Sequence, residues 1–85
     1  MNLEFDPQAL QDLSLWKIHD KKKAERIIAL LEDIIKTPYS GIGKPEPLRY
    51  SLAGCWSRRI DREHRLVYRV EHNTIIVLAC KYHYK

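Results

Sequence analysis

The strongest hydrophobic pattern in the chain is helical, and it follows Asp20. The Asp20 carboxylate can cap a helix by accepting hydrogen bonds from backbone N–H groups of the first turn. Pro38 disfavours a helical conformation in the residue before it, so this helix should end at Thr37. Between these limits apolar side chains recur with a helical period, at Ala24, Ile27, Ile28, Leu31, Ile34 and Ile35.

A shorter helix is predicted just before this one. Asp6 and Pro7 form a typical helix start, with the aspartate as N-cap and the proline at the first helical position. The helix should end near His19, and residues 2–5 before it are a short strand candidate. Two such helices are expected to lie antiparallel and to pack by one face. The first one has an apolar stripe at spacings of three, formed by Leu10, Leu13 and Trp16.

The second half of the chain has the pattern of strands. After an ordered loop at 39–47, which is rich in glycine and proline, apolar runs predict strands near 49–52, 55–60, 65–70 and 74–84. The stretch 75–79 is apolar throughout, which is typical of a central strand covered on both sides. The expected fold is α+β, with two N-terminal antiparallel helices packed on a twisted antiparallel sheet of four to five strands.

Alternation along the last two strands predicts which residues share a sheet face. His83 lies on the opposite face of its strand from Tyr82, which is expected to point to the core. Arg65 shares a face with His83 only if the connection between their strands has an odd number of residues or a strand contains a bulge. A three-residue loop at 71–73 satisfies this condition. The other histidines, His19, His64 and His72, are expected in surface or turn positions.

Length and composition indicate one globular domain spanning residues 1–85. The net charge of +4 is unevenly distributed. Residues 1–35 hold five Lys/Arg and seven Asp/Glu, a net charge of −2, whereas residues 36–85 hold ten and four, a net charge of +6. A basic half of this kind is typical of a phosphate-rich partner, although many basic domains bind nothing of the kind.

Several other classes of protein are disfavoured. No apolar run is long enough to span a bilayer, and the first residues lack the features of a signal peptide, so a cytoplasmic location is expected. Cys55 and Cys80 lie in apolar stretches, where thiols pack as small hydrophobes without forming a disulfide. The spacing Cys80-x-x-His83 lacks two further ligands for a metal, so neither a metal nor another cofactor is expected.

Four segments together resemble the YoeB/Txe toxins of the RelE superfamily. They are Gly41-Ile-Gly-Lys-Pro-Glu-Pro-Leu48, Leu52-Ala-Gly-Cys-Trp-Ser-Arg-Arg-Ile60, Glu63-His-Arg-Leu-Val-Tyr68 and Cys80-Lys-Tyr-His-Tyr84. The resemblance implies an endoribonuclease that cleaves mRNA in the ribosomal A site and leaves 2′,3′-cyclic phosphate and 5′-hydroxyl ends. It also implies a homodimer, a cognate antitoxin of the YefM/Axe type, and binding of operator DNA through the complex with that antitoxin.

The resemblance also assigns roles to individual residues. It implies that Glu46 is the general base, Arg65 the phosphate stabiliser and His83 the general acid. Lys85 extends the chain past Tyr84, where members of the family end. Further contacts to RNA or to phosphate are expected from Lys44, Arg49, Arg58, Arg59 and Tyr84.

The chemistry of the residues agrees with these roles. Metal-free cleavage beside a ribose needs a base for the 2′-hydroxyl, an acid for the leaving oxygen and cations around the phosphorus. Glu46 is held stiffly between two prolines, but a carboxylate is a weak base for a sugar hydroxyl, so positioning on the ribosome must supply much of the rate. The basic half also carries aromatic residues that can stack on bases, although Trp56 and Tyr82 suit a core equally well: Tyr39, Tyr50, Trp56, Tyr82 and Tyr84.

Two other functions are compatible with the basic half of the chain. One is a noncatalytic protein that binds RNA or the ribosome, and the other is a ParE-like toxin of related fold that acts on gyrase. Neither needs a base, an acid and an arginine together, so the set Glu46, Arg65 and His83 favours the nuclease.

Overall fold

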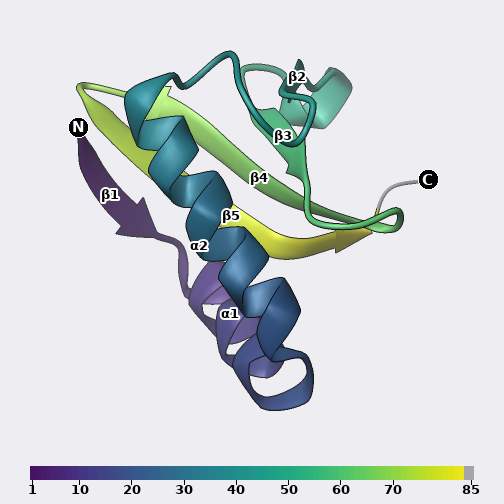
Figure 1. The fold of residues 1–85 in the computed structure, drawn as a ribbon. Helices are drawn as coiled ribbons and strands as arrows, with labels where there is room; N and C mark the ends of the chain where they lie inside the picture. Colours follow the sequence, from purple (N-terminus) through teal and green to yellow (C-terminus); the bar gives the residue numbers. More distant parts are fainter. Residues whose placement is uncertain (84–85) are drawn as a thin grey trace.

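The computed structural model describes residues 1–83, in which two helices lie across one face of a five-stranded sheet (Figure 1). The predicted α+β fold with two N-terminal helices is confirmed. Within residues 1–83 no helix is long and apolar enough to cross a membrane. The elements in chain order are β1 (Asn2–Phe5), α1 (Pro7–His19), α2 (Lys21–Lys36), β2 (Glu46–Pro47), the 3-10 turn η1 (Tyr50–Leu52), β3 (Trp56–Arg59), β4 (His64–Glu71) and β5 (Thr74–His83).

The sheet is mixed, with the strand order β1-β5-β4-β3-β2. Strands β2 to β5 pair antiparallel, but β1 runs parallel to β5, with Asn2 beside Thr74 and Phe5 beside Val77. The prediction of a wholly antiparallel sheet is therefore wrong at this edge. The two helices separate β1 from the rest of the sheet in the chain, and a connection of that length allows a parallel partner.

Both helices begin and end where their capping residues predict. The Asp6 carboxylate accepts a hydrogen bond from the Gln8 N–H at 3.0 Å, and the Asp20 carboxylate accepts one from the Lys23 N–H at 3.4 Å. At the end of α2, the Thr37 N–H donates to the carbonyl of Asp33. Local side-chain chemistry was thus sufficient to predict the bounds of these elements.

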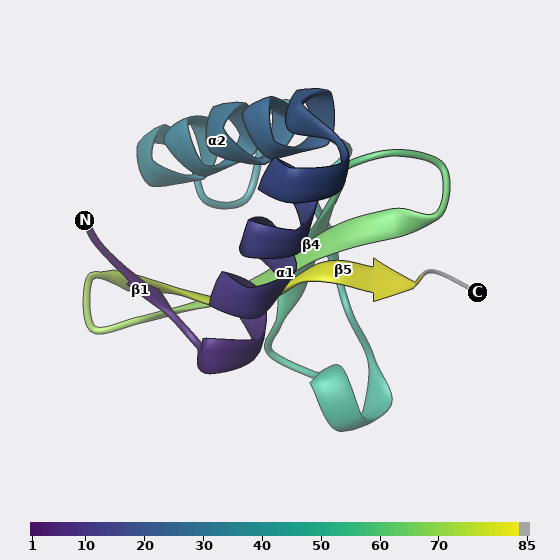
Figure 2. The same cartoon turned by 90° about the horizontal axis from the view of Figure 1, so that it is seen from below.

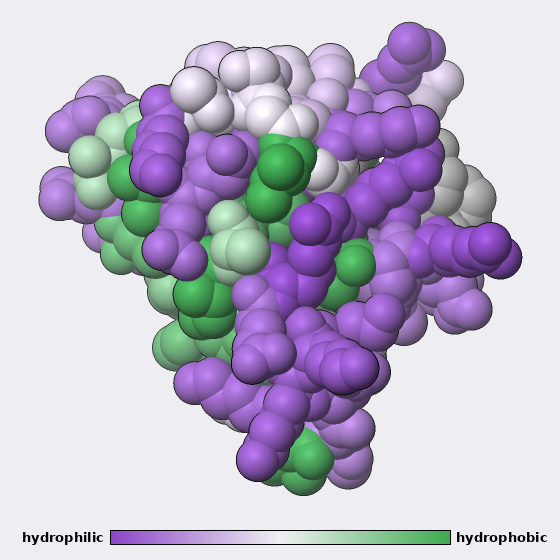
Figure 3. Space-filling model, in the orientation of Figure 1, coloured by the Kyte–Doolittle hydropathy of each residue, from purple (hydrophilic) through white to green (hydrophobic). Residues whose placement is uncertain are grey.

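The buried faces of the helices differ from the predicted stripes. Leu10 of α1 is 51% exposed, and the buried residues of this helix include Asp12. In α2, Ile28 and Ile35 are exposed and Leu30 is fully buried. Each helix packs both against its neighbour and against the sheet, so packing geometry selects the buried positions from a broader apolar face. Figure 3 shows the α2 side, where hydrophilic side chains cover most of the surface and hydrophobic ones form smaller groups.

The last strand is held to α1 at Cys80. The buried Asp12 carboxylate accepts the Cys80 N–H at 2.9 Å, and Trp16 Nε1 donates to the Cys80 carbonyl at 2.8 Å. Both cysteines are free and buried, as predicted. Burial, aided by the charge of Asp12, raises the pKa of the Cys80 thiol to about 12.

The β4–β5 hairpin has a different register from the predicted one. Its loop contains only two residues, His72 and Asn73, both with positive φ (47° and 59°), and Glu71 pairs with Thr74. Two positive φ values are the signature of the tight hairpin turn that matches strand twist. The predicted three-residue loop is therefore wrong.

Two register shifts follow along the hairpin, one between Tyr68 and Val67 and one between Val67 and Arg65. Beyond them Arg65 pairs with Tyr82, and His64 pairs with His83. Arg65 and His83 are therefore on opposite faces of the sheet, contrary to the prediction. The two shifts together add two residues to β5 and so leave the faces unchanged, and the outcome follows from the two-residue loop, where three residues were predicted.

The predicted strand at 49–52 is also wrong. Residues 50–52 form the 3-10 turn η1, in which Tyr50 has a positive φ of 59°. Figure 2 shows this turn on the side of the sheet away from the helices, where it projects from the molecule. The alternating large residues that suggested a strand at 49–52 belong instead to a turn with exposed side chains.

A buried arginine connects the helix layer, the 37–42 loop and the sheet. Arg58 of β3 is fully buried, and its side chain donates five hydrogen bonds, the number of N–H groups that a guanidinium carries. Its Nε donates to the Tyr68 hydroxyl, and Nη1 donates to the Asp33 carboxylate and, at 3.0 Å, to the Ile42 carbonyl. Its Nη2 donates to the carbonyls of Thr37 (2.7 Å) and Ser40 (3.0 Å).

The groups around Arg58 are adapted to it. The hydrogen bond from Arg58, together with one from the Ile42 N–H, lowers the pKa of the Asp33 carboxyl. Burial raises the pKa of Tyr68, whose hydroxyl donates to the Pro38 carbonyl. At Gly41 a Cβ atom would lie 2.0 Å from the Asp33 carboxylate, so only glycine fits beside this pair.

Replacement of Arg58 by methionine should destabilise the fold by about 3 kcal/mol or more, since each buried acceptor that loses its donor costs about 1–3 kcal/mol. The expected result is a large drop in the urea midpoint of unfolding, followed by circular dichroism. Arg59→Met is the matched control, because Arg59 is the exposed neighbour on the same strand. Equal midpoints for the two variants would show that the buried network contributes little.

Candidate active site

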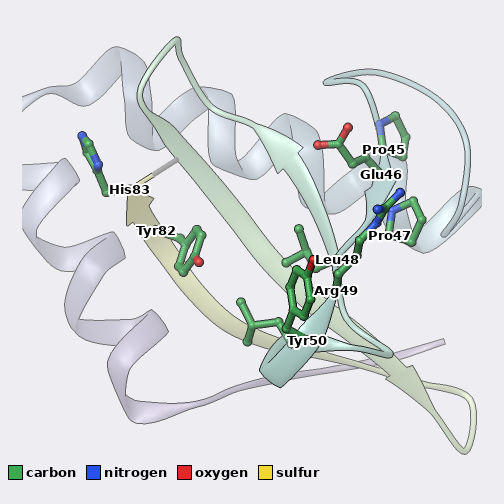
Figure 4. A pocket seen from close by; sticks show the side chains of 9 residues that line it. Pro45, Glu46, Pro47, Leu48, Arg49, Tyr50, Tyr82 and His83 are labelled. Carbon is green, nitrogen blue, oxygen red and sulfur yellow. The ribbon is translucent and has the colours of Figure 1, made fainter. Parts of the chain in front are cut away.

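A groove with a volume of about 1020 Å³ is formed by the β2–η1 segment and the end of β5 (Figure 4). One wall comes from residues 45–50 and Leu52, and the other comes from Tyr82 and His83. The helices cover the opposite face of the sheet, so this face is open to a large ligand. The residues that line the groove are Pro45, Glu46, Pro47, Leu48, Arg49, Tyr50, Leu52, Tyr82 and His83.

Glu46 is placed by a two-residue strand. It pairs with Ser57 of β3, and the Leu48 N–H that follows donates to the Cys55 carbonyl at 2.9 Å. On the other side of Glu46, the Arg59 N–H donates to the Gly43 carbonyl at 2.7 Å. Backbone hydrogen bonds before and after Glu46 therefore fix this exposed carboxylate on the groove wall, as the bracketing prolines suggested.

Arg65 lies in the middle of the sheet and is only 4% exposed. It pairs with Arg59 of β3 on one side and with Tyr82 of β5 on the other, so the three residues share the groove face. Arg65 Nη1 donates to the carbonyls of Asp61 (3.0 Å) and His64 (3.3 Å), which holds the guanidinium in place. Because Arg59 and Arg65 lie directly opposite each other, positive charge is concentrated on this face, which suits a phosphate.

His83 lies at the end of the groove but is turned from it. Figure 4 shows its ring pointing away from Tyr82, and the ring centroid is 6.2 Å from that of His64. Its Nε2 is 3.9 Å from the Glu63 carboxylate. The structure thus brings Glu46, Arg65 and Tyr82 to the groove face and leaves the His83 ring on the other side of its strand.

The neighbours of His83 form a cluster that the sequence did not predict. His64 begins β4, where its ring lies 5.0 Å from the Trp16 ring and 3.1 Å from the Asp61 carboxylate. Burial raises the pKa of Asp61, but hydrogen bonds from the backbone and ring of His64 and from the Glu63 N–H outweigh it and lower the pKa to about 2. The spacing Asp-x-x-His is typical of such a turn and was the available signal.

The remaining predicted RNA contacts fall into three groups. Arg49 lines the groove, and the exposed Arg59 lies on the same face. Lys44 precedes β2 with a positive φ of 51°. Arg58 is buried and donates five hydrogen bonds to protein acceptors, so the prediction that it binds phosphate is wrong. Tyr84, like Lys85, lies outside the described residues.

No group of three or more His, Cys, Asp or Glu side chains within residues 1–83 is arranged to hold a metal ion. The chemically useful groups on the groove face are a carboxylate, arginines and tyrosines. Such a set can hold an anion and take up a proton.

Comparison with known proteins identifies the same family along nearly the whole chain. The family model described as the YoeB-like toxin of bacterial type II toxin–antitoxin systems matches residues 5–84. The Toxin YoeB of Mycobacterium bovis is 51% identical over 83 residues, which cover 98% of each chain.

Solved structures agree with the family match. The YoeB/ParE toxin from Agrobacterium tumefaciens has a TM-score of 0.94 and 41% identity, over 99% of this chain and all of that one. YoeB from Staphylococcus aureus has a TM-score of 0.91 as a dimer and 0.89 in a heterotetrameric YoeB–YefM complex. In both cases the identity is 47%, over 99% of this chain and 98% of that one.

Acid should destabilise the protein partly through Asp61. The pKa of Asp61 is about 2 in the folded chain against an ordinary value of 3.8. Its contribution to the free energy of unfolding is therefore complete above pH 3.8 and is lost as the pH falls toward 2. Asp61→Asn should therefore lower the unfolding free energy at neutral pH and flatten its decline in acid. Urea titrations at several pH values measure both effects, with Glu32→Gln on the exposed side of α2 as the control. An unchanged slope in Asp61→Asn would contradict the assignment.

Proposed function

Because this chain belongs to the YoeB-like toxin family of bacterial type II toxin–antitoxin systems, we propose that it is a ribosome-dependent endoribonuclease. In this proposal it cleaves mRNA in the A site and thereby stops translation. The observation that carries the proposal is the open groove, where Glu46 faces a sheet surface that bears Arg59 and Arg65. A carboxylate beside paired arginines is better suited to promoting attack on a phosphodiester than to simple binding of RNA.

The reaction begins at the 2′-hydroxyl of the nucleotide before the cut. Glu46 takes the proton of this hydroxyl, and the oxygen attacks the neighbouring phosphorus. Arg65, assisted by Arg59 and Lys44, stabilises the negative charge that builds up on the phosphoryl oxygens. The bond to the 5′-oxygen then breaks, and His83 supplies the proton that the leaving oxygen needs. The products are a 2′,3′-cyclic phosphate and a 5′-hydroxyl.

His83 reaches the leaving oxygen by rotation of its side chain. The side chain is 61% exposed, so its ring can turn without displacing core residues. No metal is required in this scheme, because side chains supply the base, the acid and the positive charge. The ribosome contributes by holding the mRNA in line for attack, which compensates for the weak basicity of a carboxylate.

The partners proposed for this chain follow from its relatives. The YoeB of Staphylococcus aureus is found as a dimer and in a heterotetramer with YefM. We propose a homodimer and an antitoxin of the YefM/Axe type for this chain, with operator DNA bound through their complex. Exposed apolar residues such as Ile18 and Ile28 on the helices are suited to protein contacts. A cytoplasmic location is part of the same proposal, since the mRNA–ribosome complex is the substrate.

Loss of the acid or the base should abolish most of the cleavage. His83→Gln and Glu46→Gln should each slow single-turnover cutting of ribosome-bound mRNA by about 10²- to 10⁴-fold, the usual contribution of a general acid or base. Primer extension on purified ribosomal complexes measures the rate and maps the ends. His19→Gln, at the exposed end of α1, is the control and should cut at the wild-type rate.

Other outcomes separate the competing functions. A wild-type chain that binds ribosomes without cutting mRNA would support a noncatalytic binder. Inhibition of gyrase without mRNA cleavage would support a ParE-like activity. Wild-type rates in both variants would remove Glu46 and His83 from the catalytic machinery and leave the nuclease without an assigned acid and base.

A further inference from the structure

Two tyrosines in the groove have no role in the proposed chemistry. Tyr50 is 91% exposed and Tyr82 is 40% exposed, although tyrosine carries a large apolar ring. Both line the groove, from opposite walls (Figure 4). A single exposed ring is common on protein surfaces, but two of them lining one groove form a surface suited to binding a flat or apolar group.

The backbone holds Tyr50 in an unfavourable conformation. Its φ of 59° lies in the left-handed region, which a bulky residue rarely adopts. The turn is fixed by hydrogen bonds from the Leu52 N–H to the Arg49 carbonyl (3.1 Å) and from the Ala53 N–H to the Tyr50 carbonyl (3.0 Å). Unfavourable conformations that the surrounding structure maintains tend to occur at ligand sites. Here the conformation keeps the phenol ring on the groove wall.

Tyr82 reaches the opposite wall because of the register shift between the pairs Val67–Ala79 and Arg65–Tyr82. Regular alternation from the buried Cys80 would turn Tyr82 to the core, whereas the observed pairing with Arg65 turns it to the groove face. The contact of Asp12 with the Cys80 N–H lies just before this point. The fold therefore presents a tyrosine on each side of the same groove.

The charge around the two rings indicates the kind of ligand. Arg49 adjoins Tyr50, and Arg65 pairs with Tyr82, whereas Glu46 is the one acidic residue among the described residues that line the groove. Flat rings beside guanidinium groups match a nucleotide, whose base stacks on an aromatic face while its phosphate meets a cation. An apolar peptide would use the rings but offer nothing to the positive charge of this face.

We propose that Tyr50 and Tyr82 form a base-binding subsite that stacks an unpaired nucleobase of single-stranded RNA between the two walls of the groove. The subsite rests on the proposed function, since it shares its groove, and it deepens that function by adding a recognition element for the bases next to the scissile phosphate. Stacking accepts any base, so the subsite positions the strand without reading its sequence by hydrogen bonds.

The test uses the full chain and a short oligoadenylate with 2′-O-methyl riboses, which lacks the attacking hydroxyl and cannot be cleaved. Binding is followed by fluorescence anisotropy at several salt concentrations. A strand of the same length without bases measures the phosphate contribution alone. The variants are Tyr50→Ala, Tyr50→Phe and Tyr82→Ala, with Tyr39→Ala as control because Tyr39 is a half-exposed tyrosine that is not among the residues lining the groove.

Tyr50→Ala and Tyr82→Ala should each weaken binding of the oligoadenylate by about 5- to 150-fold, the range found when a stacking residue is removed. Tyr50→Phe should bind like the wild type, since it keeps the aromatic face, and so should Tyr39→Ala. The baseless strand should bind both tyrosine variants as it binds the wild type. Arg49→Ala should reduce the dependence of log affinity on log salt by about one, whereas Tyr50→Ala should leave that slope unchanged.

Wild-type affinity in Tyr50→Ala, or equal losses in Tyr50→Phe and Tyr50→Ala, would overturn the subsite. So would a wild type that binds the oligoadenylate no tighter than the baseless strand. Loss of antitoxin binding in Tyr50→Ala with unchanged RNA binding would assign the rings to a peptide instead. Failure of the wild type to cut ribosome-bound mRNA would contradict the proposed nuclease function. The binding results test the subsite independently of that outcome.

Discussion

The guanidinium of Arg58 is the group on which the rest of this structure depends. It places a positive charge out of contact with water, a cost that is offset because its five hydrogen bonds end on protein acceptors. Those acceptors belong to α2, to the 37–42 loop and to β4, so one side chain of β3 connects both layers. The loop leads into β2, and the position of Glu46 at the groove therefore depends on a residue that faces the opposite side of the sheet.

The same sheet thus has two different faces. Toward the helices it presents Leu66, Tyr68 and the buried Arg58, and toward the groove it presents Arg59, Arg65 and Tyr82. The arginine of the inner face directs its side-chain N–H groups to five protein acceptors, whereas the two of the outer face lie opposite each other and concentrate positive charge on the groove face. In a toxin of the YoeB-like family, this division explains how so small a chain builds both a stable core and a basic surface from neighbouring positions of one strand.

The candidate site could be predicted from the sequence in part. Proline on both sides of Glu46 indicated an ordered carboxylate, and the basic second half indicated a phosphate-rich partner. Two expectations failed for related reasons. Arg58 and Arg59 are adjacent and chemically alike, and only the acceptors that α2, the 37–42 loop and β4 bring around one of them decide which is buried. Arg65 and His83 were placed on one face by assuming a three-residue loop, whereas the turn at His72 and Asn73 has only two residues and puts them on opposite faces.

The sequence by itself determined the elements whose causes are local. Asp6, Asp20 and Pro38 set the helix limits, and the apolar run at 75–79 set an interior strand, β5, because capping and periodicity act over a few residues. Only the tertiary structure decided the parallel edge strand, the buried stripe of each helix and the face on which Tyr82 lies. These depend on contacts between residues far apart in the chain, such as Asp12 with Cys80, and no local pattern encodes them.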